Sequence, residues 1–500
     1  MKLQQLLSFF DLSAHNVRFP ERASEMDEEI TSLCFDARQA QPSSVFFAIK
    51  GQQADGHHYI SQAITKGARA IITESLSYVP ADYTGFALEV PDTRQMLDLL
   101  AARFYDYPSQ KMICFGVTGT NGKTSITYLL EHILNFNRKL TGVMGTINHR
   151  VGHRVWDSQM TTPDPVVLQS RLRDFVDEGA FAAALEVSSH ALDQRRADSV
   201  HFNTVVFTNL THDHLDYHQS MKHYFESKQK LFTDLMWSSV KRPLFAVVNV
   251  DDDYGRRLKV AEPVICWTYG QTESDFQFKI LKMDFNDTEF ELKTPVETMK
   301  IKIPLTGVHT VYNVVASLAA SLTCGITLEQ GVRSLQSFSG VPGRLQKVIS
   351  STDKVVFIDY AHTPDALENS LNSLKKIKTD AKLNNKIITV FGCGGDRDKT
   401  KRPKMAEIAC RLSDFVFVTS DNPRTEDPIQ ILKDIEQGIP TNFQSFVAEV
   451  DREQAIKQAI ALASAGDVIL IAGKGHEDYQ ILGTTKIHFS DYEVAQKYLG

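Results

Sequence analysis

The chain lacks the features that would place it outside the reducing interior of a cell. Its six cysteines are scattered through 500 residues and form no Cys-x-x-Cys pair, so we expect neither a disulfide framework nor a structural zinc site. No stretch approaches the roughly 20 apolar residues of a membrane span, and glutamines and an aspartate interrupt the first residues before a signal-peptide core could form. We therefore expect a cytoplasmic protein with no membrane partner.

An excess of basic residues is also missing. The formal net charge is −7, which argues against a nucleic-acid partner. Hydrophobic residues make up 42% of the chain and charged residues 23%, as in ordinary globular proteins. A chain of this length predicts about three domains of ~150 residues. There is no repeat or low-complexity segment, and we expect a monomer.

What the sequence does have is a glycine-rich turn between a predicted strand and a predicted helix. Residues 116–124 read Gly-Val-Thr-Gly-Thr-Asn-Gly-Lys-Thr, after the apolar run 112–115 and before apolar residues at helical spacing. Backbone N–H groups of such a turn, and the helix N-terminus, bind phosphate. Lys123 adds a cation, and Thr124 offers a hydroxyl to nucleotide-bound Mg²⁺. The standard loop has glycine where this chain has Val117, so a plain surface turn is the alternative.

Three later strand ends carry polar chemistry. One apolar run ends in Glu186, a second leads to three histidines and two aspartates within 212–218, and a third ends in aspartates 251–253. Carboxyl ends of parallel strands share one edge of a sheet, so Glu186, this cluster and Thr124 are expected to meet around a metal. The cluster could be a zinc site, a Mg²⁺ site with one histidine ligand, or a polar helix cap; the phosphate loop favours Mg²⁺. Spacing places Lys228 only on an exposed helix face.

The flanking segments are predicted to be α/β at both ends of the chain. Near the N-terminus, strands at 45–49 and 70–73 enclose a helix at 59–67, and the polar loop 50–56 is either a ligand loop or a connector. Residues 275–303 alternate as an antiparallel hairpin, and a helix starts near 305.

From residue 345 onward, four apolar strands each end in glycines and charged residues, which predicts a doubly wound sheet with a ligand site at one edge. Asp451 and Gln454 form a capping box for one of its helices. The turn 392–395 lacks Gly-x-Gly-x-x-Gly, and Asp396 would repel a pyrophosphate, so we reject a dinucleotide fold.

Five motifs in one register over essentially the whole chain resemble those of the Mur ligases; they lie at 118–124, 186–190, 208–216, 359–365 and 392–398. This family uses the variant phosphate loop. The resemblance implies an α/β protein of three domains. These are a small N-terminal α/β UDP-binding domain (1–95), a central P-loop-type parallel-sheet ATPase domain (96–340) and a C-terminal Rossmann-like doubly wound domain (341–500).

The resemblance also implies an ATP-dependent, ADP-forming amide ligase of peptidoglycan precursor synthesis, with ATP and Mg²⁺ as cofactors. Its partners would be UDP-N-acetylmuramoyl-L-alanyl-D-glutamate and meso-diaminopimelate. The γ-phosphate would activate the D-Glu side-chain carboxylate as an acyl phosphate, which the incoming amine attacks. Lys123 and Mg²⁺ would neutralise the charge of the two approaching anions.

By resemblance, site residues fall into five groups. The catalytic residues would be Lys123, Glu186, His214, Lys228 and His362. The metal would be held by Thr124, Glu186, His214 and Lys228, the last as a carbamate. ATP would be bound by Gly119, Thr120, Asn121, Gly122, Lys123, Thr124, Ser125, Asn313, Arg344 and Asp359. The UDP-muramoyl peptide would be bound by Ala37, Arg38, Gln52, Gln53, Ala54, Thr161, Thr162, Ser188, Gln194 and Arg196. Diaminopimelate would be bound by Arg397, Asp421, Asn422, Pro423, Arg424, Gly473 and Glu477.

The choice of amino acid rests on Arg424. Diaminopimelate differs from lysine by a second carboxylate, which an arginine can take in a bidentate fork. Lysine would leave that guanidinium without a partner. The alternatives are a lysine-adding ligase, a folylpolyglutamate synthetase-like ligase, and a P-loop kinase or nucleotide-gated binding module; for Arg424 itself, the alternative is a surface turn residue. Ala37 departs from the Asp-Ser-Arg usual in the family, so a hydroxyl contact to the nucleotide is missing or replaced.

Overall fold

The computed structural model describes residues 1–20, 23–51 and 54–500. The chain divides into two compact units, Met1–Tyr269 with Ala316–Thr327, and Gly270–Val315 with Leu328–Gly500. Each unit is described by itself. The three-domain boundaries at 95 and 340 stay a prediction.

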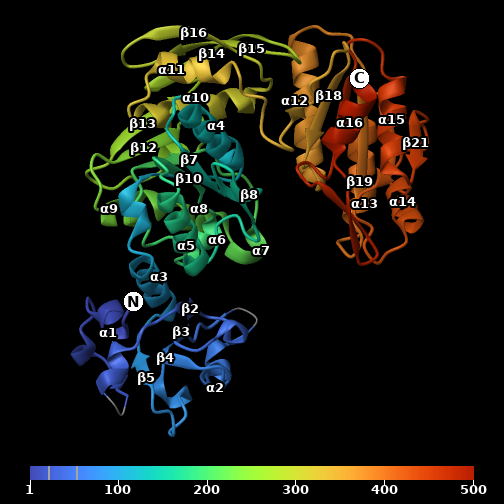
Figure 1. Ribbon diagram of the computed structural model, residues 1–500. Coiled ribbons are helices and arrows are strands. Elements are labelled where there is room, and N and C mark those ends of the chain that lie inside the picture. Colours follow the sequence, from blue (N-terminus) through green and yellow to red (C-terminus); the bar gives the residue numbers. More distant parts are fainter. Residues whose placement is uncertain (21–22, 52–53) are drawn as a thin grey trace. The chain divides into compact units, whose positions relative to one another are not determined.

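The first unit begins with a small, mostly parallel sheet in the order β1-β5-β4-β3-β2, in which only β1 is antiparallel (Figure 1). Its strands alternate between two apolar faces: Val45 and Phe47 pack toward α1 and α3, whereas Phe46 packs toward α2. The elements are β1 (Val17–Arg18), β2 (Ser32–Cys34), β3 (Ser44–Phe47), β4 (Ala68–Thr73), β5 (Phe86–Glu89), α1 (Leu3–Leu7), α2 (Ile60–Thr65) and α3 (Thr93–Phe104).

The larger sheet of this unit follows, in the order β13-β12-β11-β6-β10-β7-β8-β9. It is parallel from β13 to β7, while β8 and β9 are antiparallel. Its strands are β6 (Ile113–Thr118), β7 (Thr141–Met144), β8 (Asn148–Val151), β9 (Arg154–Asp157), β10 (Ala182–Glu186), β11 (Thr204–Phe207), β12 (Phe245–Asn249) and β13 (Ile265–Gly270). Its helices are α4 (Lys123–Phe136), α5 (Pro165–Asp177), α6 (Ser189–Asp193), α7 (Leu215–His218), α8 (Met221–Gln229) and α9 (Met236–Ser238), with a π-helical turn at Leu231–Leu235.

The position of β6 decides where the phosphate loop lies. β6 pairs in parallel with β10 on one side and β11 on the other. The loops that follow all three strands therefore leave the sheet at the same edge, where ligands of such sheets bind.

The second unit begins with three antiparallel strands, β14 (Phe276–Met283), β15 (Thr288–Lys293) and β16 (Thr298–Ile303). We predicted a two-stranded hairpin over 275–303; the range is right, but two turns divide it into three strands. The turns lie at 284–287 and 294–297, where Asp284 and Thr294 accept N–H groups of the turn. Helix α10 (Val308–Leu322) comes next, with residues 308–315 in this unit and 316–322 in the first unit, and α11 (Leu328–Leu335) follows.

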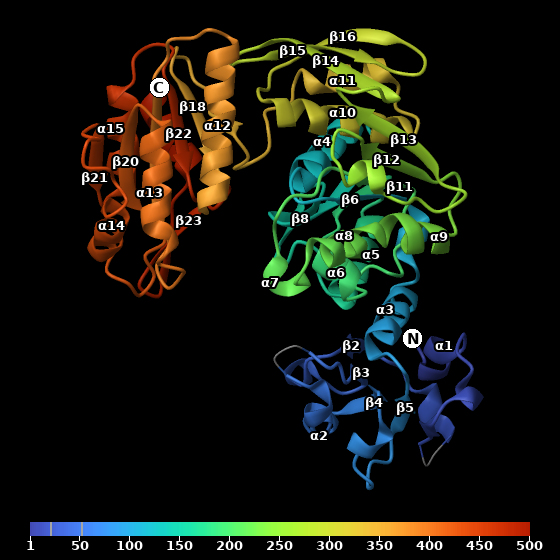
Figure 2. The same ribbon diagram turned by 180° about the vertical axis from the view of Figure 1, so that it is seen from behind.

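The rest of this unit is a doubly wound sheet in the order β17-β18-β22-β19-β20-β21, parallel except for β17. One face packs on α12, α13 and α14, and the other on α15 and α16; Figure 2 shows α12 and α13 in front of the sheet. Its strands are β17 (Gln346–Lys347), β18 (Val355–Asp359), β19 (Ile387–Cys393), β20 (Phe415–Ser420), β21 (Phe446–Glu449) and β22 (Val468–Ala472). A separate antiparallel sheet of two strands is formed by β23 (Tyr479–Leu482) and β24 (Thr485–His488). The helices are α12 (Pro364–Asp380), α13 (Lys401–Leu412), α14 (Pro428–Glu436), α15 (Arg452–Leu462) and α16 (Asp491–Leu499).

The predicted α/β class is confirmed in both units. Asp451 caps α15 by accepting the N–H of Gln454, as its sequence predicted. Of the helices in the described ranges, none combines the length and the apolarity needed to cross a membrane.

Candidate functional site

The turn between β6 and α4 has the backbone of a phosphate loop. Gly119 and Gly122 have φ angles of 144° and 89°, where a side chain would be strained. A Cβ at Gly119 would also lie 1.8 Å from Thr208 Oγ1. Gly122 is the N-cap of α4 and has no side chain to satisfy the helix's first N–H groups, so these groups suit an outside anion.

The next loop braces this turn. Asn209 accepts the N–H of Thr120 through its carbonyl (2.8 Å) and the N–H of Asn121 through its side chain (3.0 Å). Thr208 Oγ1 donates to the carbonyl of Asn121 (2.6 Å). Ser125 follows, half-buried, in the first turn of α4. The loop's shape is thus fixed by the segment after β11.

Two lysines reach one carbonyl of the loop. Lys123 Nζ donates to Gly119 O (2.9 Å) and Thr120 O (2.8 Å), and Lys228 Nζ donates to Gly119 O (2.9 Å). The expectation that Lys228 lies on an exposed face of its helix is wrong, because the side chain is 1% exposed. Burial, and then the charge of Lys123, lower the pKa of Lys228 well below its usual range.

Glu186 meets the loop through hydroxyl groups. Its Oε2 accepts from Thr124 Oγ1 (3.0 Å) and Thr146 Oγ1 (3.1 Å), and its Oε1 accepts the N–H of Thr146 (2.9 Å). The predicted meeting of Glu186 and Thr124 is therefore present. A Cβ at Gly145 would lie 2.1 Å from Glu186 Oε1, so only glycine allows this approach.

The side chains of 212–218 do not gather as zinc ligands in the described part of the chain, and neither of its aspartates caps a helix. The N-caps of α7 and α8 are His214 and Ser220, so the alternative that Asp213 or Asp216 caps a helix is wrong. Across residues 1–20, 23–51 and 54–500, no three His, Cys, Asp or Glu side chains gather as a metal site would require. Mg²⁺ needs fewer protein ligands, since it keeps waters and binds one or two carboxylates together with substrate phosphates. Glu186 and Thr124 offer such oxygens.

His214 lies near the two lysines of the phosphate loop, since the charges of Lys123 and Lys228 act on its imidazole. Its backbone is left-handed (φ 52°), and its ring packs edge-on against His190, with centroids 4.9 Å apart. Burial lowers the pKa of His214, and the charges of Lys123 and Lys228 lower it further, while Asp213 opposes them. The imidazole therefore favours its neutral form, which can ligate a cation.

Five residues predicted for the muramoyl peptide share one hydrogen-bonded network. Thr162 Oγ1 donates to Glu186 O (2.7 Å) and accepts the N–H of Ser188 (3.0 Å). Thr161 Oγ1 lies 3.0 Å from Thr146 Oγ1. Arg196 donates to Gln194 Oε1 (2.6 Å) and to Thr162 O (3.0 Å).

The uridine candidates lie in the small N-terminal sheet, where their contacts stay local. Arg38 is exposed and forms a bidentate pair with Asp36, which also accepts its backbone N–H. Ala37 is buried beside it, and Ala54 O accepts the N–H of Gly51 (2.9 Å). Gln52 and Gln53 lie outside the described residues.

The nucleotide candidates of the second unit lie on α10, just before β17 and at the end of β18. Asp359 is buried, and its carboxylate accepts the N–H of Leu345 (2.7 Å) and Ser370 Oγ (3.1 Å). Burial raises its pKa, and these hydrogen bonds and Arg344 oppose that rise. The Arg344 guanidinium lies 5.5 Å from the Tyr360 ring, and the His362 ring packs on the same tyrosine (4.6 Å). Asn313 is half-buried on α10.

Three diaminopimelate candidates meet beside a buried lysine. Asn422 Nδ2 donates to Glu477 Oε2 (2.9 Å), and Lys474 Nζ lies 3.2 Å from the same oxygen. Asp421 is buried nearby, which raises its pKa, and Arg452 and Lys474 oppose the rise. Gly473, with φ 116°, brings its backbone against Asp421: a Cβ there would lie 2.9 Å from Oδ2.

Arg424 lies over the Gly394–Gly395 turn. Its Nη1 donates to Gly395 O (2.8 Å). A Cβ at Gly394 would lie 3.0 Å from this Nη1. Arg397 borders the same turn, since its Cγ lies 3.8 Å from that Cβ position. Arg424 is left-handed (φ 52°), and its N–H donates to Ile481 O, so β23 fixes its backbone. Pro423 is buried just before it.

Three family models match the chain: Mur ligase family, catalytic domain, over residues 29–105; Mur ligase middle domain, over 117–321; and Mur ligase, glutamate ligase domain, over 343–475. A UDP-N-acetylmuramoyl-L-alanyl-D-glutamate--2,6-diaminopimelate ligase of Geobacillus thermodenitrificans is 42% identical over 504 residues, 99% of each chain. The chain belongs to the Mur ligase family. The ligase of the same name from Synechococcus elongatus is 44% identical to this Mur ligase over 95% of each chain.

Solved structures support the same membership. A structure of a UDP-N-acetylmuramoyl-L-alanyl-D-glutamate--2,6-diaminopimelate ligase aligns with a TM-score of 0.72 at 31% identity, covering 100% of this chain and 98% of that one. A D-alanyl-D-alanyl-adding ligase from Acinetobacter baumannii aligns with a TM-score of 0.60 at 20% identity over 95% of each chain, which shows the fold alone. The predicted three-domain Mur ligase fold is confirmed.

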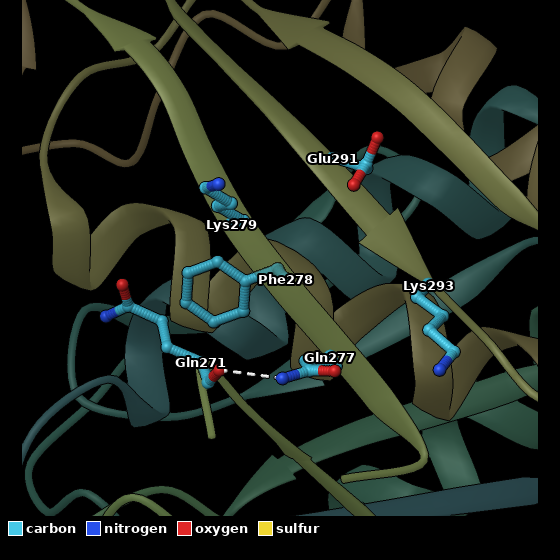
Figure 3. A pocket seen from close by; sticks show the side chains of 6 residues that line it. All are labelled: Gln271, Gln277, Phe278, Lys279, Glu291 and Lys293. Atoms are coloured by element: carbon cyan, nitrogen blue, oxygen red, sulfur yellow. Dashed lines mark hydrogen bonds between the residues drawn. The ribbon is translucent and has the colours of Figure 1, made fainter. Parts of the chain in front are cut away.

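A hollow lies on the three-stranded sheet of this Mur ligase. It measures about 270 Å³ and is lined by Gln271, Gln277, Phe278, Lys279, Glu291 and Lys293 (Figure 3). No candidate site residue lines it.

Sequence reasoning missed two contact residues of the Mur ligase site. Thr146 follows β7 at the same sheet edge as Glu186, so the strand-end argument could have found it. Lys474 follows Gly473 after the end of β22, in a glycine-rich loop whose sequence does not indicate burial. Its burial needed the fold.

Proposed function

We propose that this Mur ligase is an ATP-dependent, ADP-forming amide ligase that adds meso-2,6-diaminopimelate to UDP-N-acetylmuramoyl-L-alanyl-D-glutamate in peptidoglycan precursor synthesis. The observation that carries the choice of amino acid is the place of Arg424 beside Arg397 at the Gly394–Gly395 turn. Curated relatives at 42–44% identity over nearly the whole chain bear the name of this activity.

The proposed reaction has two steps. The γ-phosphoryl group passes from ATP to the D-Glu side-chain carboxylate, giving ADP and an acyl phosphate. The amino group of diaminopimelate then attacks the acyl carbon, the amide forms, and phosphate and a proton leave. The first step brings two anions together, so it needs positive charge and N–H donors at the phosphate.

The phosphate loop supplies those donors. The N-terminus of α4 and Lys123 would bind the phosphates, and Asn209 keeps the loop in shape for them. Mg²⁺, held by Thr124 and Glu186 with His214 and the Lys228 carbamate, would neutralise charge on the transferring phosphoryl group. Lys228 suits carbamate formation because its burial favours the neutral amine, which is the nucleophile toward CO₂.

Separate sets of residues would bind the substrate peptide and the nucleotide. Thr161, Thr162, Ser188, Gln194 and Arg196 would bind the muramoyl peptide, since their network ends on the carbonyl of Glu186. Arg38, Ala37 and Ala54 would bind the uridine end, together with Gln52 and Gln53. Asn313, Arg344 and Asp359 would contact ATP, with His362 beside them.

The amino acid would bind at the strand ends of the second unit. Glu477 and Asp421 suit an ammonium group, and Arg424 with Arg397 suits the second carboxylate that lysine lacks. Asn422, Pro423 and Gly473 would complete the binding site between them. A lysine ligand would leave the Arg424 guanidinium without its partner.

The deciding experiment measures phosphate release from ATP with the UDP-muramoyl dipeptide and either meso-diaminopimelate or L-lysine. We expect release with diaminopimelate and far less with lysine. Release with lysine alone would overturn the role of Arg424 and identify the lysine-adding ligase. No release with either amino acid would favour another activity, and glutamate addition to a folate or phosphoester formation would then be assayed.

ATP and nucleotide-sugar substrates imply that the enzyme works in the cytoplasm. We also expect a monomer. Size-exclusion chromatography with light scattering of the purified chain tests the second point.

A further inference from the structure

A buried lysine lies beneath the proposed amino-acid pocket. Lys474 is 0% exposed, and its Nζ lies 3.2 Å from Glu477 Oε2, 3.3 Å from Asn422 Oδ1 and 3.9 Å from Asp421 Oδ1. All three of these neighbours were assigned to the ligand. Lys474 itself has no surface with which to reach a ligand.

The hydrogen bonds around Lys474 fix the orientation of two pocket side chains. Asn422 Oδ1 accepts from Lys474 and from the N–H of Ile481 (3.0 Å), which leaves Nδ2 to donate to Glu477. Glu477 receives both bonds on Oε2, which leaves Oε1 as the oxygen available to a ligand. Lys474 thus sets which atoms of Asn422 and Glu477 remain for binding.

A second buried ion pair holds the backbone of the same site. Arg452 and Asp491 are 1% and 0% exposed and pair through two bonds of 2.7 Å. Arg452 also donates to Ala472 O (3.0 Å) and Ser420 O (3.3 Å). These carbonyls end β22 and β20, one residue before Gly473 and Asp421. The loops that carry the pocket therefore start from a fixed frame.

The charges of the cluster point to the kind of group that it receives. Three carboxylates, those of Asp421, Glu477 and Asp491, face two cations, Arg452 and Lys474. Fully ionised, the cluster carries one negative charge in excess, and an ammonium group would neutralise it. Burial makes that balance matter, because an unmatched charge is costly away from water.

We propose that Lys474 is a positioning residue, which holds Glu477 and Asn422 in the orientation that receives the ammonium group of the incoming amino acid. This inference rests on the proposed function. Lys474 acts through its two neighbours and touches neither the nucleotide nor the acyl phosphate. Its loss should therefore weaken amino-acid binding and leave the first step of the reaction intact.

The test compares Lys474→Met with Lys433→Met, a matched change of an exposed lysine on α14. Steady-state kinetics of the full chain give KM for each of the three substrates. We expect KM for diaminopimelate to rise about tenfold or more in Lys474→Met, with KM for ATP and for the UDP-muramoyl dipeptide unchanged. Lys433→Met should match the wild type. An unchanged diaminopimelate KM in Lys474→Met overturns the proposal.

Two further measurements separate positioning from a loss of folding. The first step needs no amino acid, so exchange of label between ADP and ATP, in the presence of the UDP-muramoyl dipeptide, should persist in Lys474→Met. Glu477→Gln and the double variant complete a cycle: if Lys474 acts through Glu477, the double variant loses little more than Glu477→Gln alone. Additive losses overturn the proposal.

Should Lys474→Met not fold, Lys474→Arg keeps the charge and gives the same readouts. A KM for diaminopimelate closer to the wild type than in a folded Lys474→Gln supports positioning, and equal values contradict it. A wild type that joins no amino acid to the dipeptide refutes the proposed function itself. An active wild type with an unmoved KM in the variants refutes only the role of Lys474.

Discussion

Lys228 and Lys474 are both almost completely buried, at 1% and 0% exposure, yet their surroundings differ. Lys474 lies among three side-chain oxygens, two of them from carboxylates. Lys228 donates to a single backbone carbonyl, that of Gly119, and within residues 1–20, 23–51 and 54–500 no carboxylate forms an ion pair with it. Of the charges that act on its pKa, the cation Lys123 has the largest effect and lowers it, while Asp213 raises it.

The difference teaches what each lysine is for. A buried ammonium beside carboxylates has its desolvation cost offset by those ion pairs and their hydrogen bonds. A buried ammonium beside another cation favours its neutral form, which is a nucleophile. By these proposals, the same residue type would position pocket side chains in one unit and would react as an amine in the other.

The largest expected effect is on turnover and follows from a change of Lys228. Lys228→Ala removes the amine that carbamylation requires, so turnover should fall by on the order of 10²–10³-fold, while ATP still binds to the loop. Phosphate release and equilibrium ATP binding measure the two quantities. Lys222→Ala, an exposed change on the same helix, should leave both unchanged.

The carbamate itself can be tested separately from the side chain. Depleting CO₂ and bicarbonate from the buffer should lower the wild-type rate, and adding bicarbonate should restore it. Full activity of Lys228→Ala, or a wild-type rate indifferent to bicarbonate, would show that the amine has no such role.

The next effect concerns the pocket that Lys474 supports. Arg424→Ala removes the guanidinium proposed for the second carboxylate of diaminopimelate, so kcat/KM for that substrate should fall by about 10–100-fold. The ratio of its kcat/KM to that of lysine should narrow in parallel. Arg411→Ala, on the exposed surface of α13, is the control. An unchanged ratio would place the specificity elsewhere.

A buried histidine extends the comparison to a third base. His149 on β8 is 2% exposed, and neither ring nitrogen has a hydrogen-bond partner among the described residues. Burial lowers its pKa to about 4, and Arg171 adds to the effect. The unfolded chain, with a histidine pKa near 6.5, binds the proton more readily, so stability is complete above about pH 6.5 and is lost as the pH falls toward 4.

The lowered pKa of His149 should reduce the free energy of unfolding by about 1–2 kcal/mol between pH 7 and pH 5. Urea unfolding at the two pH values measures it in the wild type and in His149→Phe, where the pH dependence should be weaker. His153→Phe, in the exposed turn after β8, should retain the wild-type dependence. Equal slopes in all three proteins would contradict the assignment.

The smallest expected effect is on kcat/KM for ATP and concerns the contacts of two carboxylates, Glu477 and Glu186. Glu477 is held by a lysine, whereas Glu186 is held by threonine hydroxyls and an N–H group. Thr146→Val removes one hydroxyl and keeps the N–H, so kcat/KM for ATP should fall about fivefold, the equivalent of about 1 kcal/mol. Thr485→Val on exposed β24 is the control. A loss as large as that of Lys228→Ala would mean that Thr146 does more than orient Glu186.

Sequence patterns predicted the parts of the molecule that depend on neighbours in the chain. The apolar run before Gly116 and the helical spacing after Lys123 gave β6 and α4, and the rule for parallel strand ends brought Glu186 to Thr124. The helix around Lys228 has too few apolar residues to signal burial, and its lysine is covered by the phosphate loop, over 100 residues earlier. Lys474 was missed for the same reason: the side chains that pair with it come largely from the loop after another strand.

The contacts of Lys123 have a consequence for nucleotide affinity. Its ammonium already donates to two carbonyls of its own loop. An arriving phosphate must therefore replace existing hydrogen bonds, and the exchange yields less binding free energy than a solvent-exposed ammonium would give. Small anions such as free phosphate gain little from such an exchange, which favours a ligand with several phosphoryl groups. In the proposed role of Lys123, its attraction would be strongest while negative charge on the phosphoryl group shifts during transfer, which would speed the reaction.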